Sequence, residues 1–334
     1  MSEAGFLSAA RYGKDKVRVL RVVREPESKV HHIVEYNVTV LLEGDIETSY
    51  TQADNKVVVA TDSMKNITYY LAKISPHILS PTRFALHLAT HLVSKYPHIH
   101  KSFVTVDQLR WTRIVTSSKE GVADLEGGHT HAFWRDGDEK KFAKVEVAEK
   151  EGKAKLSAKV EGGLRDLLVL KSTGSAFEDF VRDEYTTLVE VKDRILSTSI
   201  DLTYAFVPFT ITAPTDEKKL EFGEANCCVA SKEGGAWDAD KVAKISRDIT
   251  LDVFAHDESA SVQATLYKIA QTILAPASDP SKRVSDVRIA LPNKHYIPVN
   301  MSYIGVDNMT PNVAEVFQPV DAPSGLITAT ISRT

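Results

Sequence analysis

The stretch HIVEYNVTVLLEG, residues 32–44, decides the fold class because apolar side chains stand at every second position from Val34 to Leu42. This is the period of a β-strand with one buried face, and the run is rich in the valine that strands favour. NKVVVATD has a similar composition and predicts another strand over Asn55–Asp62. Further strands are predicted over Ser102–Val115, His129–Asp136 and Lys141–Glu149.

A helix is predicted within PTRFALHLATHLVSKYP, residues 81–97. Phe84, Leu88 and Leu92 share helical spacing there, and Pro97 supplies a stop signal.

The second half of the chain repeats the order of strands, helix and strands. Val262, Leu266, Ile269 and Ile273 share one face of a helix predicted within residues 259–275. Strands are predicted over residues 164–172, 183–191, 194–207, 283–301 and 325–334.

This repeated order indicates an internal duplication. Residues 57–72 can be laid over residues 193–206, which matches Thr61 with Thr198. The Lys/Glu-rich segment 136–163 is interpreted as a solvated linker between the halves. We therefore expect two domains, residues 1–150 and 151–334, in line with a prior of roughly 150 residues per domain.

Each half is predicted to be an antiparallel sheet covered by helices on one face, which is an α+β architecture. The other face and the sheet edges would stay exposed in a monomer. We therefore expect several copies to close into a ring.

The composition excludes several classes of protein. With 334 residues, 43% hydrophobic and 26% charged, the chain has the composition of a globular protein. A net charge of -4 gives no basic footprint for nucleic acid, and no apolar run reaches the ~18 residues of a membrane span. The start lacks a secretory signal, and Cys227 and Cys228 are adjacent, so we expect an intracellular protein without a disulfide framework.

Three histidine pairs raise the question of a metal. HLATH, residues 87–91, lacks the glutamate of H-E-x-x-H, and its histidines are interpreted as partly exposed, with His87 near the polar face. The pairs His98/His100 and His129/His131 each share a strand face, which leaves metal ligation open. Since no third ligand of suitable spacing follows, we predict no metal site.

Four short pieces contain the residue types of a reactive site. Taken singly, each has a purely structural explanation: a solvated lysine, a helix cap, a core phenylalanine and a strand-end histidine. They are YGKDK with Lys14, VATDS with Thr61 and Asp62, LKSTGSAF with Phe177, and ALPNKHY with Asn293 and His295.

Taken together, these pieces resemble the urate oxidase (uricase) family. The resemblance runs through RYGKDKVRV, LLEGDIETSYTQADN, VVVATDSMKN, VLKSTGS, DEYTTL, DRILST, SASVQAT and LPNKHY, and it thins out over residues 136–163 and 210–242. It implies the tunnelling fold (T-fold), with two tandem sheet-plus-helix domains. It also implies a tunnel-shaped homotetramer with active sites at the subunit interfaces.

The resemblance also implies roles for individual residues. Lys14 and Thr61 match a catalytic dyad, with Thr61 and Asp62 contributed by the neighbouring subunit, and His295 matches the third member of a proton relay. The positions that match those holding urate and dioxygen are Thr61, Asp62, Phe177, Leu188, Arg194, Val262, Gln263 and Asn293. An aromatic ring, a forked cation and an amide suit the face and edge of a flat anion.

The implied activity is the conversion of urate, dioxygen and water to 5-hydroxyisourate and hydrogen peroxide in purine catabolism. No cofactor is expected, because deprotonated urate itself donates electrons readily. Two other functions stay open on the residues alone: a metal-dependent pterin or GTP hydrolase of the same fold, and a purine-binding module without turnover.

Two features depart from the family pattern. Glu178 and Asp179 stand where fungal relatives are expected to have an aromatic residue and a glycine, and two carboxylates would hinder an anionic substrate unless they point outward. The final Ser-Arg-Thr differs from the Ser-Lys-Leu type of peroxisomal signal. The resemblance therefore implies the peroxisome, with the cytoplasm as the alternative.

Overall fold

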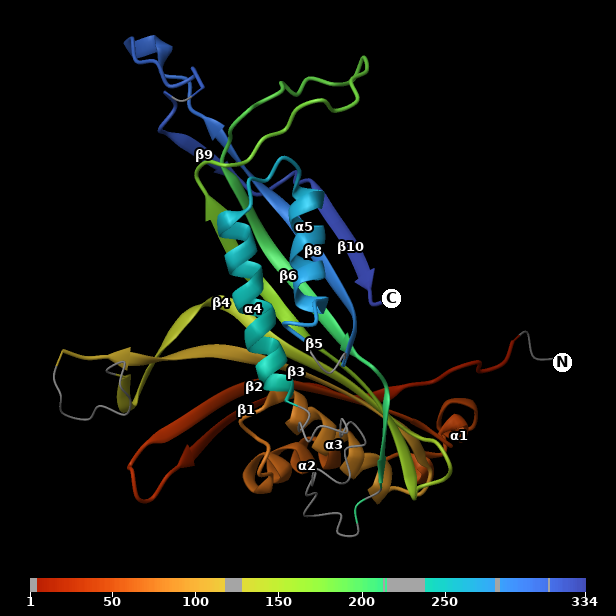
Figure 1. Ribbon diagram of the computed structural model, residues 1–334. Coiled ribbons are helices and arrows are strands. Elements are labelled where there is room, and N and C mark those ends of the chain that lie inside the picture. The colour runs from red at the N-terminus through yellow and green to blue at the C-terminus, as the bar shows by residue number, and fades with distance from the viewer. Residues whose placement is uncertain (1–4, 118–127, 213, 215–237, 280–282, 312) are drawn as a thin grey trace. The chain divides into compact units, whose positions relative to one another are not determined.

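The computed structural model describes residues 5–117, 128–212, 214, 238–279, 283–311 and 313–334 (Figure 1). The chain divides into two compact units, which are described separately. The first comprises Met1–Gly163 and Ala205–Ala243, and the second comprises Leu164–Tyr204 and Lys244–Thr334. The chain passes between the units within β5 (Lys155–Lys171), β6 (Leu196–Phe206) and α4 (Ala239–His256).

The first unit contains an antiparallel sheet in which neighbouring strands follow the order of the chain. Its strands are β1 (Tyr12–Arg24), β2 (His31–Gly44), β3 (Ile99–Val115) and β4 (Gly128–Glu149), followed by the beginning of β5, which β7 (Phe209–Thr212) joins. One row of buried apolar side chains crosses four strands in register: Val17, Val38, Val106 and Ala143.

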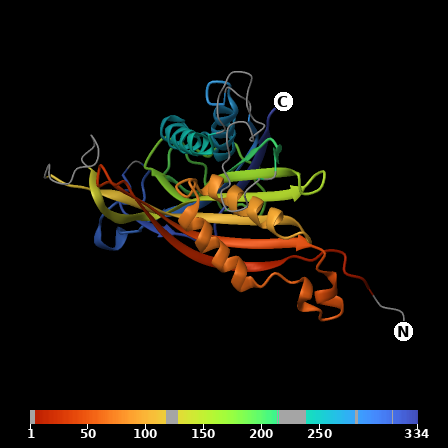
Figure 2. The ribbon, with the colours of Figure 1, turned by 90° about the horizontal axis from the view of Figure 1, so that it is seen from below.

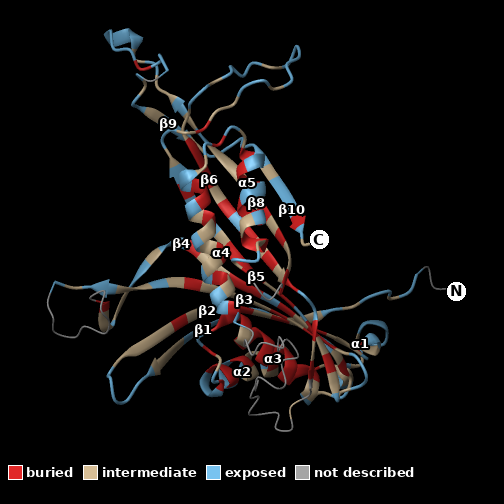
Figure 3. Ribbon diagram, in the orientation of Figure 1, coloured by how far each residue is buried: buried red, intermediate tan, exposed pale blue. Residues whose placement is uncertain are grey.

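Helices α2 (Thr61–Ile74) and α3 (Pro81–Lys95) pack against this sheet, after the short helix α1 (Glu47–Thr51) (Figure 2). α3 is buried along most of its length (Figure 3). Tyr36 of β2 stacks on Phe84 of α3 with ring centroids 5.7 Å apart, and its hydroxyl donates to Ile78 O at 2.6 Å. The alternating stretch therefore points its apolar face at the helices, and the strand and the helix predicted there are confirmed.

The second unit contains the end of β5 followed by β6, β8 (Val284–Pro298) and β10 (Leu326–Ser332) in that strand order. β8 and β10 are antiparallel, and α5 (Val262–Leu274) packs on both. Short β9 (Phe317–Val320) pairs with the end of β8. Arg333 donates to Leu274 O and Val284 O at 2.9 Å each, which fastens the last strand to the end of α5.

Element order supports the predicted duplication. With the short elements α1, β7 and β9 set aside, the order strand, strand, helix, helix, strand, strand occurs twice: β1, β2, α2, α3, β3 and β4, and then β5, β6, α4, α5, β8 and β10. The domain boundary between residues 150 and 151 stays a prediction. The particular alignment of residues 57–72 with 193–206 is wrong, because Thr61 begins a helix and Thr198 lies in a strand.

Three other predictions fail for identifiable reasons. The strand predicted over Asn55–Asp62 does not form. A 3₁₀ turn covers Asn55–Val57 instead, and the Asp54 side chain caps this turn by accepting from Lys56 N at 3.0 Å. Residues 183–191 form a turn and a loop, because the Asp183 carboxylate accepts from Tyr185 N at 3.0 Å and from the Thr186 hydroxyl.

The Lys/Glu-rich segment 136–163 is not a linker. It forms the end of β4, a turn and the beginning of β5, and its alternate residues are buried, among them Val147 and Leu156. The lysines and the other glutamates of the segment stay at least partly exposed, whereas Glu139 is buried and pairs with Arg110, so charge density alone misled the prediction. In the described residues, no helix is both long and apolar enough to cross a bilayer.

Candidate active site

Lys14 lies near the start of β1, directly before an irregularity in the strand. The pairing of β1 with β2 shifts register between Lys14 and Val17, and Lys16 has a φ of 54°. A bulge of this kind bends a strand and re-aims the neighbouring side chains. The half-buried Lys14 side chain is thus placed by an irregular piece of backbone.

Gly13 allows β1 to approach β2 closely just before Lys14. A Cβ at Gly13 would lie 1.8 Å from Val40 O and 2.8 Å from Leu41 Cα. Both of these atoms belong to the backbone of β2, so no side-chain rotation would relieve the clash. The glycine is therefore required for the position of the lysine that follows it.

Thr61 and Asp62 are the first two residues of α2, which packs on β1. Asp62 accepts from Lys65 Nζ at 2.5 Å and from Asn66 Nδ2 at 2.9 Å. The hydrogen bond from Lys65 is the main cause of the lowered pKa of Asp62, and the charge of Lys14 lowers it further. Lys14 therefore lies within electrostatic reach of the start of α2 in the same chain.

Tyr12 connects the same two segments. Its hydroxyl accepts from Val59 N at 2.7 Å, and partial burial raises its pKa. Tyr12 stands two residues before Lys14, and Val59 stands two residues before Thr61. The bond therefore fastens the segment that leads into Thr61 to the strand that carries Lys14. Sequence reasoning missed Tyr12, although it opens the YGKDK piece.

In the second unit, Phe177 and Arg194 lie side by side. The Arg194 guanidinium carbon is 5.0 Å from the centre of the Phe177 ring. Phe177 is held by two backbone hydrogen bonds with Val191, at 2.8 and 3.0 Å. The ring also stacks on Phe180, with centroids 4.7 Å apart and planes 13° from parallel. An aromatic ring and a planar cation therefore lie next to each other at this position.

Asp193 organises the backbone beneath this pair. Its carboxylate accepts from the Thr173 hydroxyl, from Gly174 N at 2.8 Å and from Ser175 N at 3.4 Å. These bonds, first that of Thr173, lower the pKa of Asp193. In addition, Arg194 N donates to Ser175 O at 2.8 Å. Asp193 is a second functional residue that sequence reasoning missed, although it directly precedes Arg194.

Two of the buried polar atoms without partners belong to predicted site residues. In the part of the chain that the structure describes, neither Arg194 Nε nor Asn293 Oδ1 has a hydrogen-bond partner. Burial also lowers the pKa of Arg194, although a guanidinium stays charged in proteins. Leaving such a group unpaired costs about 1–3 kcal/mol, so both atoms favour a polar ligand that would complete their bonding.

The beginning of α5 supplies further donors. Ser261 is its N-cap and accepts from Ala264 N at 3.1 Å. Val262 and Gln263 are the first two helical residues, whose N–H groups lack partners within a helix. The helix dipole makes this end favourable for an anion. Val262 is buried and Gln263 is exposed, so the amide side chain of Gln263 is accessible.

Asn293 and His295 lie in the second half of β8. Asn293 N donates to Gly325 O at 2.8 Å, and exposed His295 pairs with Val320 of β9. Between them, Lys294 forms an ion pair with Asp321 at 2.9 Å. The hydrogen bond to Asp321 raises the pKa of Lys294. Lys294 therefore has a structural partner of its own.

The remaining positions of interest lie on the loop after Phe177. Leu188 is 52% exposed, and its carbonyl oxygen accepts from Arg182 at 2.8 Å. Glu178 and Asp179 are both exposed. Asp179 has a φ of 57°, a backbone conformation that glycine adopts without strain. A glycine expected at this position in relatives has a direct conformational reason.

The histidine pairs form no metal centre among the described residues, where no group of three or more His, Cys, Asp or Glu side chains could hold an ion. The prediction that His87 and His91 are partly exposed is wrong, since they are 0% and 3% exposed. His87 shares a 2.8 Å hydrogen bond with Ser75, and burial lowers its pKa to about 3. It is a neutral core histidine. Cys227 and Cys228 lie outside the described residues.

The predicted site residues thus fall into two groups. Lys14, Thr61 and Asp62 come together in the first unit. Phe177, Arg194 and the start of α5 are joined in the second unit, which also carries the other predicted positions: Leu188, Gln263, Asn293 and His295.

Comparison with known proteins gives a consistent result. A sequence model of one protein family, described as Uricase, matches residues 10–146 and 160–328. The chain is 42% identical over 327 residues to a uricase of Emericella nidulans, which covers 98% of this chain and 97% of that protein. It is 38% identical over 333 residues to a uricase of Schizosaccharomyces pombe, covering 100% of both chains.

Solved structures agree with these relatives. The crystal structure of uricase from Arthrobacter globiformis matches with a TM-score of 0.78 and 31% sequence identity. The match covers 99% of this chain and 96% of that one. The predicted antiparallel sheets with covering helices are therefore those of uricase structures.

Proposed function

The chain belongs to the uricase family of oxidoreductases, and on that premise we propose that it converts urate, dioxygen and water to 5-hydroxyisourate and hydrogen peroxide. Two electrons pass from urate to dioxygen, and water supplies the new hydroxyl group at C5. Since the electrons come from the substrate, the protein has to bind the purine, place dioxygen and move protons. No cofactor is part of this proposal.

The observation that carries the proposal is Arg194 beside Phe177. Phe177 offers a flat apolar surface for the purine, and Arg194 offers forked donors for its anionic edge. The partnerless Nε of Arg194 is a buried donor that the edge of urate would satisfy. Gln263 and the backbone N–H of Val262 would read the adjoining edge. Asn293 would hold dioxygen above the ring by donating from its amide Nδ2, and its free Oδ1 would later accept from the water that takes this place.

Lys14, Thr61 and His295 form the proposed proton relay. Lys14 takes the proton of the Thr61 hydroxyl as that hydroxyl takes one from the substrate, and His295 exchanges the proton with water. The N-terminus of α2 adds a positive field at Thr61 that favours a transient alkoxide. We propose that Thr61 and Asp62, with Lys14 of the same copy beside them, act on urate that is bound by a neighbouring copy of the chain within a homotetramer.

The first experiment mixes purified protein with urate, without added metal, and follows oxygen loss and peroxide gain together. Equal rates of both support the proposal. Binding of urate without oxygen uptake would instead indicate a purine carrier, and activity abolished by a chelator would indicate a metal-dependent enzyme.

The relay is tested with Lys14→Met and Thr61→Ala. Each is expected to slow turnover by about 10² or more while binding of xanthine, a urate analogue, persists. The double variant should be little worse than either single variant if the two residues act as one unit. Simple additivity of the two losses would contradict the dyad.

The shared site is tested by mixing Lys14→Met, which should turn over slowly, with Arg194→Ala, which should bind urate weakly. The two variants are unfolded and reassembled together and assayed at a urate concentration too low for either one to be active. If two copies contribute to each site, random assembly restores about a quarter of the sites. Each variant reassembled alone is the control. Hybrids that stay as inactive as the controls would show that each site is built by one chain.

The resemblance also supports a peroxisomal location, with the cytoplasm as the alternative. Imaging an amino-terminal fluorescent fusion beside a peroxisomal marker distinguishes the two.

A further inference from the structure

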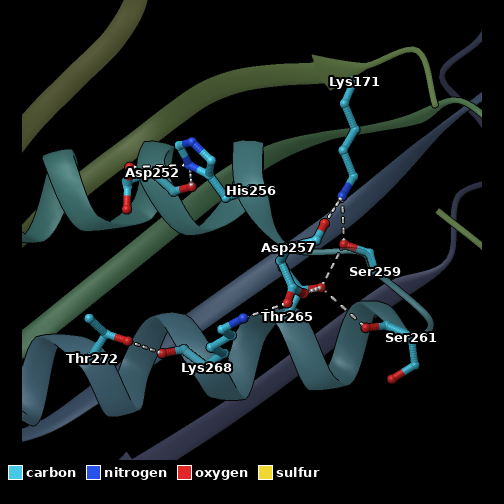
Figure 4. A network of polar contacts seen from close by, with 9 residues as sticks. All are labelled: Lys171, Asp252, His256, Asp257, Ser259, Ser261, Thr265, Lys268 and Thr272. Atoms are coloured by element: carbon cyan, nitrogen blue, oxygen red, sulfur yellow. Dashed lines mark hydrogen bonds and ion pairs between the residues drawn. The ribbon is translucent and has the colours of Figure 1, made fainter. Parts of the chain in front are cut away.

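Lys171, the last residue of β5, reaches from the sheet into the loop that precedes α5 (Figure 4). Its ammonium donates to Asp257 O at 2.5 Å and to Ser259 Oγ at 2.9 Å. It also lies 5.5 Å from the centre of the Phe254 ring of α4. One side chain therefore connects the end of a strand, the end of α4 and the loop after it.

Ser259 is the residue on which the two substrate-binding segments meet. Its N–H donates to Gly174 O at 3.0 Å, and its carbonyl accepts from Ala176 N at 3.0 Å. Gly174 and Ala176 belong to the segment that ends in Phe177. Ser259 is only 1% exposed, so this pairing is sheltered from water.

The other side of the Ser259 hydroxyl faces α5. Thr265, in the first turns of that helix, has its hydroxyl 2.7 Å from Ser259 Oγ and 2.7 Å from Asp257 Oδ2. Thr265 is 2% exposed and stands two residues after Gln263. The hydroxyl of Ser259 thus lies between the ammonium of Lys171 and the beginning of α5.

A lysine in this place carries an energetic cost. Burial lowers the pKa of Lys171, the nearby Asp257 carboxylate offsetting part of this, so the charged form gives up hydration. Such a cost is offset only by bonds that a neutral side chain would not make. Here these bonds are the ones to Asp257 O and Ser259 Oγ, and both act on the loop before α5.

We propose that Lys171 is a positioning residue for urate binding, holding Ser259 so that the Phe177 segment and the start of α5 keep a fixed separation. This inference rests on the proposed function and deepens it. The ring of Phe177 contacts the face of the purine, while Val262 and Gln263 contact its edge. A change in their separation therefore weakens binding of the substrate before any chemistry occurs.

The test is Lys171→Met, which keeps the length and apolar stem of the side chain and removes the ammonium. KM for urate should rise about tenfold or more, whereas kcat should stay within about threefold of the original. The Kd of xanthine, measured by calorimetry, should rise in parallel with KM. Lys171→Arg keeps a charged donor and should recover part of the loss.

Lys268→Met is the matched control. Lys268 forms an ion pair with the Asp257 carboxylate, through Oδ1 at 2.8 Å, whereas Lys171 binds the backbone oxygen of Asp257. The Lys268 side chain is 59% exposed. The substitution also removes one lysine charge, yet it leaves Ser259 untouched. KM and kcat should both stay within about twofold of the original.

Several outcomes would overturn the inference: an unchanged KM in Lys171→Met, a fall in kcat alone, or an equal effect of Lys268→Met. If Lys171→Met does not fold, Ser259→Ala replaces it, since this variant removes only the hydroxyl and should raise KM in the same way; an unchanged KM there refutes the inference. Failure of the unsubstituted protein to oxidise urate would defeat the proposed function, which distinguishes the two.

Discussion

Replacing Gly13 by alanine places a methyl group where the backbone of β2 already lies, 1.8 Å from Val40 O. Relief requires β1 and β2 to separate at this point, and forced overpacking of this kind costs about 1–3 kcal/mol. Lys14 is the next residue, so its ammonium would move with the strand. A misplacement of about 1 Å in a catalytic group lowers kcat about 10²-fold. Both stability and turnover should therefore fall.

The matched control is Gly44→Ala, the last residue of β2. Its Cβ would lie 2.0 Å from His98 O, which is a comparable backbone clash, but with the chain at the start of β3 and not with β1, the strand that carries Lys14. Urea unfolding should show a similar loss of stability in both variants. Steady-state kinetics on the folded fraction should show a large fall in kcat only for Gly13→Ala.

The steric reasoning is refuted if Gly13→Ala unfolds at the same urea concentration as the original protein. The link to Lys14 is refuted if both variants lose stability but keep the same kcat. A Gly13→Ala variant that yields no folded protein supports the steric part, and production of the same variant at lower temperature then provides the folded protein for the test of kcat.

Three further predictions follow from the described contacts. Tyr12→Phe should lower kcat about tenfold by releasing Val59 N, with no additional effect in a Lys14→Met background; an equal loss in both backgrounds would contradict a role through the lysine. Arg194→Ala should mainly raise KM, and an unchanged KM would remove it from substrate binding. Partial burial lowers the pKa of His100, but hydrogen bonds that its ring donates to Asp45 and Glu149 raise it overall. The stability difference between the original protein and His100→Gln should therefore be largest near pH 6 and shrink as pH rises through the raised pKa of His100. A difference that stays constant in urea unfolding from pH 6 to 8.5 would contradict this.

Local periodicity predicted the elements that bury one face. The strand around Val38, the helix around Leu88 and the helix around Ile269 all follow from spacing, because burial on one face leaves a regular trace. Composition alone gave wrong secondary structure where a distant side chain forms a hydrogen bond with the backbone. Val58 and Val59 are typical of strands, yet the Val59 N–H goes to the hydroxyl of Tyr12, 47 residues away.

The candidate site residues could be named from the sequence, and their roles stay a prediction, whereas the contacts that support them could not be foreseen. Lys14, Thr61, Phe177 and Arg194 belong to pieces with a family likeness. The supports act through long-range hydrogen bonds that no spacing reveals: the hydroxyl of Tyr12, the carboxylate of Asp193 and the ammonium of Lys171.

The interleaving of the two units has a consequence for biosynthesis. The first unit includes Ala205–Ala243, and β7 within this segment pairs with the beginning of β5. Between β5 and β7 the chain first passes through the second unit, over Leu164–Tyr204. When Gly163 has been synthesised, the residues Ala205–Ala243 that complete this unit are therefore still missing. The nascent chain must keep an incomplete sheet edge from pairing with other nascent chains until the later strand emerges, which is a window in which chaperones would matter.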